Sequence, residues 1–333
     1  MFAINKWRFI FLALLLAGFA ASLIGLGRAT AQGYPSRPVT MVVPFPAGGP
    51  TDAVARIVAD RMRKPLGQPV IVENIVGALG SIGVGRVTRA TADGYTIIFG
   101  TWSTQVVNGA VLALPYDVVG DFEPVSLVSD SPMLVVGKNA LPANDLKGLI
   151  EWLRANPDKA LNGTPGPASA ANLAALLFQN DTHTRFRSVP YRGVGLAMQD
   201  LIAGRIDLMF DLVGDAMPQV RAGTIKAYVI LQKNRLRMAP NIPTTDESGM
   251  PGFYVSSWQG IWAPKGTPKS VIGKLNSAVS DTLADPAIRQ RLAALAQEIP
   301  APEQLTPEAF GQLQKAEIEK WWPVIKAAGI KAE

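Results

Sequence analysis

Short apolar runs alternate with helix-like segments along most of the chain, and this alternation constrains the fold more than any other sequence feature. The run 39–43 (VTMVV) predicts a buried strand, and apolar residues at helical spacing follow it between Val54 and Met62. In the first part of the chain, the same patterns predict strands at 39–43, 70–72, 95–99 and 124–128, a helix capped by Thr51 or Asp52, and a helix near Ser81. The chain is therefore expected to adopt an α/β fold with a largely parallel sheet.

A second alternating block begins near Pro132 and repeats the strand, loop and helix order. It predicts strands at 133–136, 206–210 and 226–231 and helices at 146–155, from about Ser169, at 194–203 and at 215–222. A stretch rich in Pro and polar residues, 239–252, predicts a long surface connection. The last third predicts helices, because Thr267-Pro268, Asp285-Pro286 and Thr306-Pro307 each combine an N-cap residue with Pro at the first helical position.

The order of these elements predicts two lobes, with the second inserted into the first. A chain of 333 residues has room for two domains of about 150 residues each. We expect residues 32–130 and 255–333 to form lobe 1 and residues 131–254 to form lobe 2. The two segments that cross between the lobes, near 129–131 and 255–257, would act as a hinge.

The N-terminus has the layout of a secretory signal. Lys6 and Arg8 precede an apolar run, 9–26, and the small residues Ala29-Thr30-Ala31 close the segment. This order predicts export to the periplasm and cleavage after Ala31. The apolar run is also just long enough to span a bilayer, so an uncleaved membrane anchor is the alternative.

Composition excludes several kinds of chemistry. The chain has no Cys and a single His, His183, which rules out disulfides, a Cys nucleophile and metal sites built from several His or Cys. His183 lies in a polar stretch and is expected to be a solvated surface residue. The Gly-x-Ser-x-Gly elbow of α/β hydrolases and the phosphate-binding Gly-x-x-x-x-Gly-Lys-Ser/Thr loop are both missing. The sequence therefore argues against an enzyme and gives no sign of a cofactor.

The positive charge does not indicate a nucleic-acid partner. Lys and Arg number 32 against 26 Asp and Glu, but Lys6, Arg8 and Arg28 belong to the first 31 residues, which contain no acidic residue. Without them, 29 basic residues face 26 acidic ones, and no basic run concentrates the remaining +3.

Four glycine-rich or polar loops each follow a strand and precede a helix. Such loops meet at the carboxyl edge of a sheet, where free backbone N–H groups and the positive ends of helix dipoles favour bound anions. These loops are 45–51, 77–81, 100–104 and 163–169. They predict a protein that binds an anion or carboxylate without transforming it.

Seven motifs distributed through residues 34–333 resemble the Bug family, the extracytoplasmic solute receptors of tripartite tricarboxylate transporters. They are 34–38 (YPSRP), 44–52 (PFPAGGPTD), 66–74 (LGQPVIVEN), 93–95 (DGY), 189–193 (VPYRG), 207–211 (DLMFD) and 257–268 (SWQGIWAPKGTP). The resemblance implies a type II periplasmic-binding-protein fold, whose two α/β lobes close over a small organic or aromatic carboxylate. It implies inner-membrane permease subunits as partners and a monomeric protein that needs no cofactor.

The resemblance also implies which residues contact the ligand. One end of the ligand would be held by Phe45, Ala47, Gly48 and Gly49, and its carboxylate by Thr164, Gly166, Ser169 and Ala170. Further cleft positions would be Thr101, Ser103, Thr104, Asp211 and Asp215. We expect the Ser169 hydroxyl and N–H to lie beside the bound carboxylate, at the start of a helix.

The sequence departs from the family pattern at two of these places. The second-lobe loop usually resembles AGNGSS but here is 164–170 (TPGPASA), and Leu212 and Asp215 replace the usual Asn and Ser. One wall of the pocket should therefore be drier, and Asp211 with Asp215 should favour a ligand with a cationic or N–H donor group besides its carboxylate. The alternative for Asp215 is a helix cap with its side chain in solvent. A sensory receptor that presents its ligand to a signalling partner is the alternative function, and an exported α/β enzyme is a third.

Overall fold

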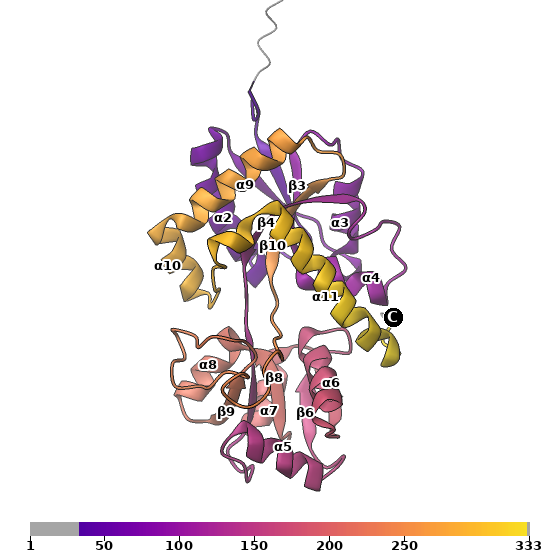
Figure 1. Cartoon of the computed structure of the whole chain (residues 1–333), viewed down its shortest axis with the longest axis vertical. Helices are drawn as coiled ribbons and strands as arrows, with labels where there is room; N and C mark the ends of the chain where they lie inside the picture. Colours follow the sequence, from indigo (N-terminus) through magenta and orange to yellow (C-terminus); the bar gives the residue numbers. More distant parts are fainter. Residues whose placement is uncertain (1–32, 332–333) are drawn as a thin grey trace, which may run out of the picture. The chain divides into compact units, whose positions relative to one another are not determined.

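The computed structural model describes residues 33–331, and the compact unit within it starts at Arg37. The segment 1–31, on which we predict the signal peptide, lies outside the described residues. In the part of the chain that is described, no helix is both long enough and apolar enough to cross a membrane. The described residues form two five-stranded sheets, with helices packed against each of them (Figure 1).

The first sheet combines strands from the first 129 residues with one strand from much later in the chain. Its order is β2-β1-β3-β10-β4, with β1 parallel to β2 and β3 and with β10 antiparallel to both β3 and β4. The strands are β1 (Val39–Val43), β2 (Val70–Asn74), β3 (Thr96–Thr101), β4 (Phe122–Ser129) and β10 (Gln259–Pro264). Four of the five strands run in the same direction and β10 alone runs against them, so the sheet is largely parallel, as predicted, with one antiparallel strand.

Helices cover both faces of the first sheet. The helices α2 (Pro50–Leu66), α9 (Lys269–Ala284) and α10 (Pro286–Ala294) pack on one another on one side. The helices α3 (Ser81–Thr88), α4 (Asn108–Val111) and α11 (Pro307–Ala327) lie on the other (Figure 1). Two 3₁₀ turns, η1 (Ala78–Gly80) and η3 (Pro302–Leu305), and one π turn, η2 (Ser103–Val107), complete this part of the chain.

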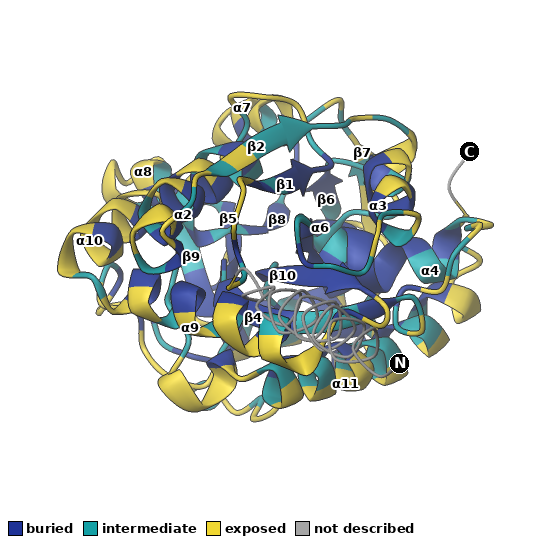
Figure 2. Ribbon diagram, turned by 90° about the horizontal axis from the view of Figure 1, so that it is seen from above, coloured by how far each residue is buried: buried dark blue, intermediate teal, exposed yellow. Residues whose placement is uncertain are grey.

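The second sheet is built from one continuous part of the chain. Its order is β7-β6-β8-β5-β9, with β6 parallel to β7 and β8 and with β5 antiparallel to β8 and β9. The strands are β5 (Met133–Lys138), β6 (Leu161–Thr164), β7 (Arg187–Pro190), β8 (Leu208–Leu212) and β9 (Ile225–Ile230), and the helices are α5 (Leu146–Ala155), α6 (Ala170–Thr182), α7 (Val194–Ile202) and α8 (Val213–Arg221). Central strands of both sheets are buried, whereas the edge strands β2 and β7 are more exposed (Figure 2).

Two chain segments cross between the sheets and pair with each other. Ser131 N–H donates to the Ser257 carbonyl over 3.2 Å, and Ser257 N–H donates back to Ser131 over 3.0 Å. A third segment joins them, since Asp130 and Glu298 exchange two backbone hydrogen bonds of 2.8 Å. The Gln297 side-chain oxygen accepts from Ser129 Oγ, Ser131 Oγ and Gln259 Nε2 over 2.9, 3.0 and 3.3 Å, so it fastens this third segment to both crossing segments.

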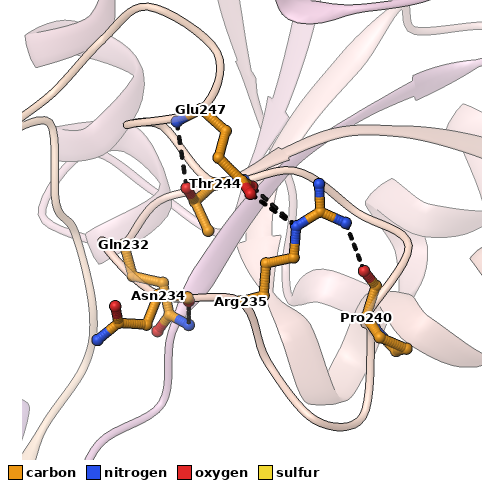
Figure 3. Close-up of polar contacts among 6 residues, drawn as sticks. All are labelled: Gln232, Asn234, Arg235, Pro240, Thr244 and Glu247. Carbon is orange, nitrogen blue, oxygen red and sulfur yellow. Dashed lines mark hydrogen bonds and ion pairs between the residues drawn. The ribbon is translucent and has the colours of Figure 1, made fainter.

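The long connection between β9 and β10 is ordered by its own polar contacts (Figure 3). Arg235 Nε lies 2.9 Å from both carboxylate oxygens of Glu247, and the Arg235 guanidinium also donates to the Pro240 carbonyl. Glu247 and Thr244 cap each other, since each backbone N–H donates to the side chain of the other. No helix or strand occurs at 239–252, as predicted for a connection, but Ala239, Ile242, Thr244 and Thr245 are buried, so the segment lies only partly on the surface.

Candidate functional site

The loop after β1 is held in place by a buried carboxylate beneath it. Asp52, which is 2% exposed, accepts from Gly48 N–H and Arg56 Nε over 2.8 Å each and from Asn74 Nδ2 over 2.9 Å. Asn74 Nδ2 also donates to the Phe45 carbonyl over 3.0 Å. Burial raises the pKa of Asp52, but the hydrogen bonds from Arg56, Gly48 and Asn74 outweigh burial and lower the pKa to about 2. The ionised carboxylate therefore fixes the loop from Phe45 to Gly49. α2 begins with Pro50 after the N-cap Gly49, so the predicted cap at Thr51 or Asp52 was wrong.

The turn after β3 presents one of its three predicted hydroxyl groups. Thr104 Oγ1 accepts from Thr101 N–H over 2.9 Å and donates to the Thr101 carbonyl over 3.1 Å, and both side chains are buried. Ser103 is half-buried and its Oγ lies 2.8 Å from Thr101 Oγ1. The two threonines thus shape the turn, while Ser103 faces outward from it.

The loop after β6 leads into the N-terminus of α6, as the sequence predicts. Ser169 is the N-cap: its Oγ accepts from Asn172 N–H over 3.2 Å, donates to the Gly166 carbonyl over 2.6 Å and lies 3.0 Å from Thr164 Oγ1. Its hydroxyl proton is therefore already engaged within the loop. Among the described residues, the N–H groups of Ala170 and Ala171, in the first turn of α6, have no hydrogen-bond acceptor. They remain able to donate to an anion.

The turn after β2 has a left-handed backbone at four successive residues. Ala78 and Leu79 have φ angles of 44° and 54°, between Gly77 at 125° and Gly80 at 89°. Asn108 Nδ2 holds this turn by donating to the Leu79 carbonyl over 2.9 Å. Gly80 lies against Pro44 and Thr104, where an added Cβ atom would come within 3.2 and 3.0 Å of their side chains. The Leu79 side chain is left 53% exposed.

These loops surround a cavity with a volume of about 660 Å³. Four predicted residues line it: Phe45, Ser103, Gly166 and Ser169. The sequence analysis did not single out the other lining residues: Leu79, Pro165, Pro167 and Ala168 lie in loops that it named, whereas Asn108 and Lys331 lie outside them. Ala47, Gly48, Gly49, Thr101, Thr104, Thr164 and Ala170 belong to the same loops and turns but do not line the cavity.

Asp211 and Asp215 are not among the lining residues either. Asp211 is the penultimate residue of β8 and is 2% exposed. Its Oδ1 accepts from Leu212 N–H over 2.8 Å, and its buried Oδ2 has no partner among the described residues. Burial and the charge of Asp215 raise the pKa of Asp211 to about 8. Asp215 is exposed in the first turn of α8, whose N-cap is Leu212 with no side-chain cap, so Asp215 does not cap this helix.

The described residues offer no site for metal chemistry. Across residues 33–331, no group of three or more His, Asp or Glu side chains could hold a metal ion. His183 is exposed at the C-cap of α6 with a φ of 51° and does not line the cavity. The cavity therefore has apolar walls, a few hydroxyl and amide groups, the N-terminus of α6 and one ammonium group, a set that suits binding of an organic anion.

Comparison with known proteins agrees with this arrangement. The sequence matches the tripartite tricarboxylate transporter family receptor over residues 54–330. A UPF0065 protein from the TAR-I ttuE-ttuC' intergenic region of Agrobacterium vitis is 39% identical over 296 residues, which are 89% of this chain and 86% of that protein.

Two solved structures extend the likeness to three dimensions. The periplasmic binding protein BugD is 38% identical with a TM-score of 0.70, over 90% of this chain and 100% of that one. MatC from Rhodopseudomonas palustris, solved with bound malate, is 38% identical with a TM-score of 0.71, over 88% of this chain and 100% of that one. These relatives are two-lobe binding proteins rather than enzymes, which confirms the predicted fold class and the expectation that the protein is not an enzyme. The chain belongs to the receptor family of the tripartite tricarboxylate transporters and is a solute-binding protein of the Bug type.

Proposed function

We propose that the protein captures a small organic carboxylate in the cavity between the loops after β1, β2, β3 and β6, and that it delivers this ligand to the membrane permease of a tripartite tricarboxylate transporter. The observation that carries the proposal is the cavity lined by Ser169, the N-cap of α6; next to Ser169, the N–H groups of Ala170 and Ala171 have no acceptor among the described residues. Malate bound to the related MatC supports a carboxylate as the ligand.

The charges around the cavity support an anionic ligand. Among the described residues that line the cavity, Lys331 is the charged one and none is acidic. The partial positive charge at the start of α6 acts in the same direction. A carboxylate placed here would exchange its water contacts for charge-assisted hydrogen bonds, which are stronger than neutral ones.

A thermal-shift screen tests ligand capture. The purified protein would be heated with mono-, di- and tricarboxylates, and a ligand present at 100 times its dissociation constant should stabilise the folded state by about 2.7 kcal/mol. Matched uncharged amides of the same acids are the control. If no carboxylate raises the melting temperature above its amide, the proposed ligand class is wrong.

Delivery and export need their own tests. Ligand-loaded protein should drive uptake into proteoliposomes that contain the permease subunits, and it should drive no uptake into proteoliposomes that lack them.

We propose that the exported protein begins at Gln32, after cleavage behind Ala31. Intact mass of the protein from the periplasmic fraction measures this, and a species that keeps residues 1–31 in the membrane fraction would contradict it.

A further inference from the structure

We propose that the cavity selects anions with one carboxylate and a compact apolar body, in which Leu79 covers the apolar body and Lys331 pairs with the carboxylate. This inference rests on the proposed function and narrows its ligand class to apolar monocarboxylates, such as aryl-substituted or medium-chain acids. It differs from the ligand of MatC, since malate carries two carboxylates and a hydroxyl group.

The cavity walls are mostly apolar. Phe45 and Leu79 face it from the loops after β1 and β2, and Pro165, Pro167 and Ala168 face it from the loop after β6. Both prolines lack an N–H group, so this loop has lost two backbone donors. A ligand that fills the cavity must therefore place most of its surface against carbon atoms.

The polar groups that do reach the cavity are largely engaged elsewhere. The Ser169 hydroxyl donates to the Gly166 carbonyl, and the Asn108 amide donates to the Leu79 carbonyl. Ser103 Oγ pairs with Thr101 Oγ1. We assign the first turn of α6 and Lys331 as the donors to the one carboxylate, and the loop after β6 presents mostly carbon atoms at Pro165, Pro167 and Ala168. A second carboxylate would lose its water without regaining comparable hydrogen bonds.

The backbone conformation around Leu79 indicates that its side chain has a specific place in the cavity wall. A left-handed conformation is unfavourable for Leu, and here Ala78 and Leu79 both adopt it. Asn108 and the close packing of Gly80 on Pro44 hold the turn in this conformation. The result is an apolar residue on the cavity wall that is 53% exposed.

Lys331 reaches the cavity because of where the last helix runs. α11 contacts β4 of the first sheet and also α4 and α6, so its C-terminal end lies near the N-terminal part of α4 and the helix that begins at the cavity (Figure 1). Lys331 follows this helix and lines the cavity with Asn108 and Ser169. An ammonium group at this point can pair with a carboxylate that also accepts from the α6 N-terminus.

Isothermal titration with four acids tests the selectivity. Phenylacetate and hexanoate are the apolar monocarboxylates, and malate and adipate are the dianions. We expect the wild-type protein to bind at least one apolar acid about tenfold more tightly than either dianion, because burial of apolar surface favours it. If malate or adipate binds as tightly as both apolar acids, the inference is overturned while the proposed function stands. If none of the four binds and the wider carboxylate screen is also negative, the proposed function itself fails.

Two variants test the individual residues. Leu79→Asn keeps a residue that tolerates the left-handed backbone, so the melting temperature should be unchanged or higher, while affinity for the apolar acid should fall about fivefold or more. Val76→Asn is the control, since Val76 is 51% exposed in the same segment but does not line the cavity. Equal affinities of the two variants would overturn the role of Leu79.

Lys331→Met should weaken binding of every acid that the wild type binds and should reduce the dependence of affinity on salt. Lys315→Met, an exposed lysine on α11 away from the cavity, is its control. If Lys331→Met binds with wild-type affinity and wild-type salt dependence, the ammonium group is not the partner of the carboxylate.

Discussion

The carboxylate of Asp52 should affect the affinity for a ligand, although it does not contact that ligand. Asp52→Asn removes the charge that orders the loop from Phe45 to Gly49, so the free energy of unfolding should fall by about 1.5–3 kcal/mol and ligand affinity should weaken with it. The pKa of Asp52 is lowered from 3.8 to about 2, so its stabilising effect is complete above pH 4 and is lost as the pH falls through 2. Urea unfolding and titration calorimetry measure both effects.

Asp60→Asn, on the same helix, is the control for Asp52. Asp60 is exposed and lies 3.6 Å from Arg63, an arrangement that contributes little to stability. If Asp60→Asn and Asp52→Asn lower stability equally, the loop does not depend on the buried network.

The carboxyl group of Asp211 should make stability fall as the pH rises. Its pKa is 3.8 when unfolded and is raised to about 8 by burial and by Asp215 in the folded protein, so between pH 4 and pH 8 the folded state binds a proton that the unfolded state releases. Stability therefore decreases with pH through this window. Asp211→Asn should remove the effect, so that the variant loses at least about 1 kcal/mol less than the wild type between pH 5 and pH 8.

Urea titrations at both pH values measure the effect of Asp211. Asp215→Asn should give an intermediate result, because it removes the neighbouring charge but not the burial. Parallel pH profiles of wild type and Asp211→Asn would show that Asp211 is ionised in the folded protein.

The N-terminus of α6 allows its capping and binding roles to be separated. Asp and Asn both cap helices well, so Ser169→Asp and Ser169→Asn should each keep the melting temperature close to wild type. Ser169→Asp adds a negative charge beside the proposed carboxylate and should weaken binding by about tenfold or more, whereas Ser169→Asn should bind nearly as well as wild type. Titration calorimetry compares them; equal affinities would place the carboxylate elsewhere.

Helices and strands with apolar runs could be predicted from local pattern, whereas strands with few apolar residues could not. Asp285 and Thr306 cap α10 and α11 as predicted, since their side chains accept from Ala287 and Ala309 N–H. Thr267 does not cap α9, because Pro268 takes the N-cap position and Thr267 Oγ1 donates to Pro264 instead. The strands β6, β7 and β10 contain Gly or Pro and few consecutive apolar residues, so only their pairing with distant strands makes them recognisable.

Local sequence pattern likewise predicts only some of the residues that line the cavity. Phe45, Ser103, Gly166 and Ser169 lie in loops that follow strands, where sequence reasoning searches for ligand contacts. Lys331 lies after the last helix, and no local pattern connects it with those loops. Leu79 resembles any apolar residue in sequence, and its left-handed backbone is the feature that gives it its position.

Ligand should make the protein more compact, as expected if the lobes rotate about the crossing segments at Ser131 and Ser257. Each crossing is a single extended segment, and such segments can absorb changes in φ and ψ between rigid sheets. Small-angle scattering with a saturating carboxylate should show a smaller radius of gyration. Ser169→Asp, expected to bind weakly, is the control, and identical dimensions of the wild type with and without bound ligand would contradict closure.

The position of β10 between β3 and β4 has a consequence for how the polypeptide acquires its structure. All strands of the second sheet lie within residues 133–230, so that sheet can assemble as soon as this segment is available. β3 and β4 have no pairing with each other, and their facing edges stay open until residues 259–264 arrive. Open strand edges favour association with other chains. During synthesis, the first sheet is therefore the last to be protected from aggregation, although it contains the first strands to emerge.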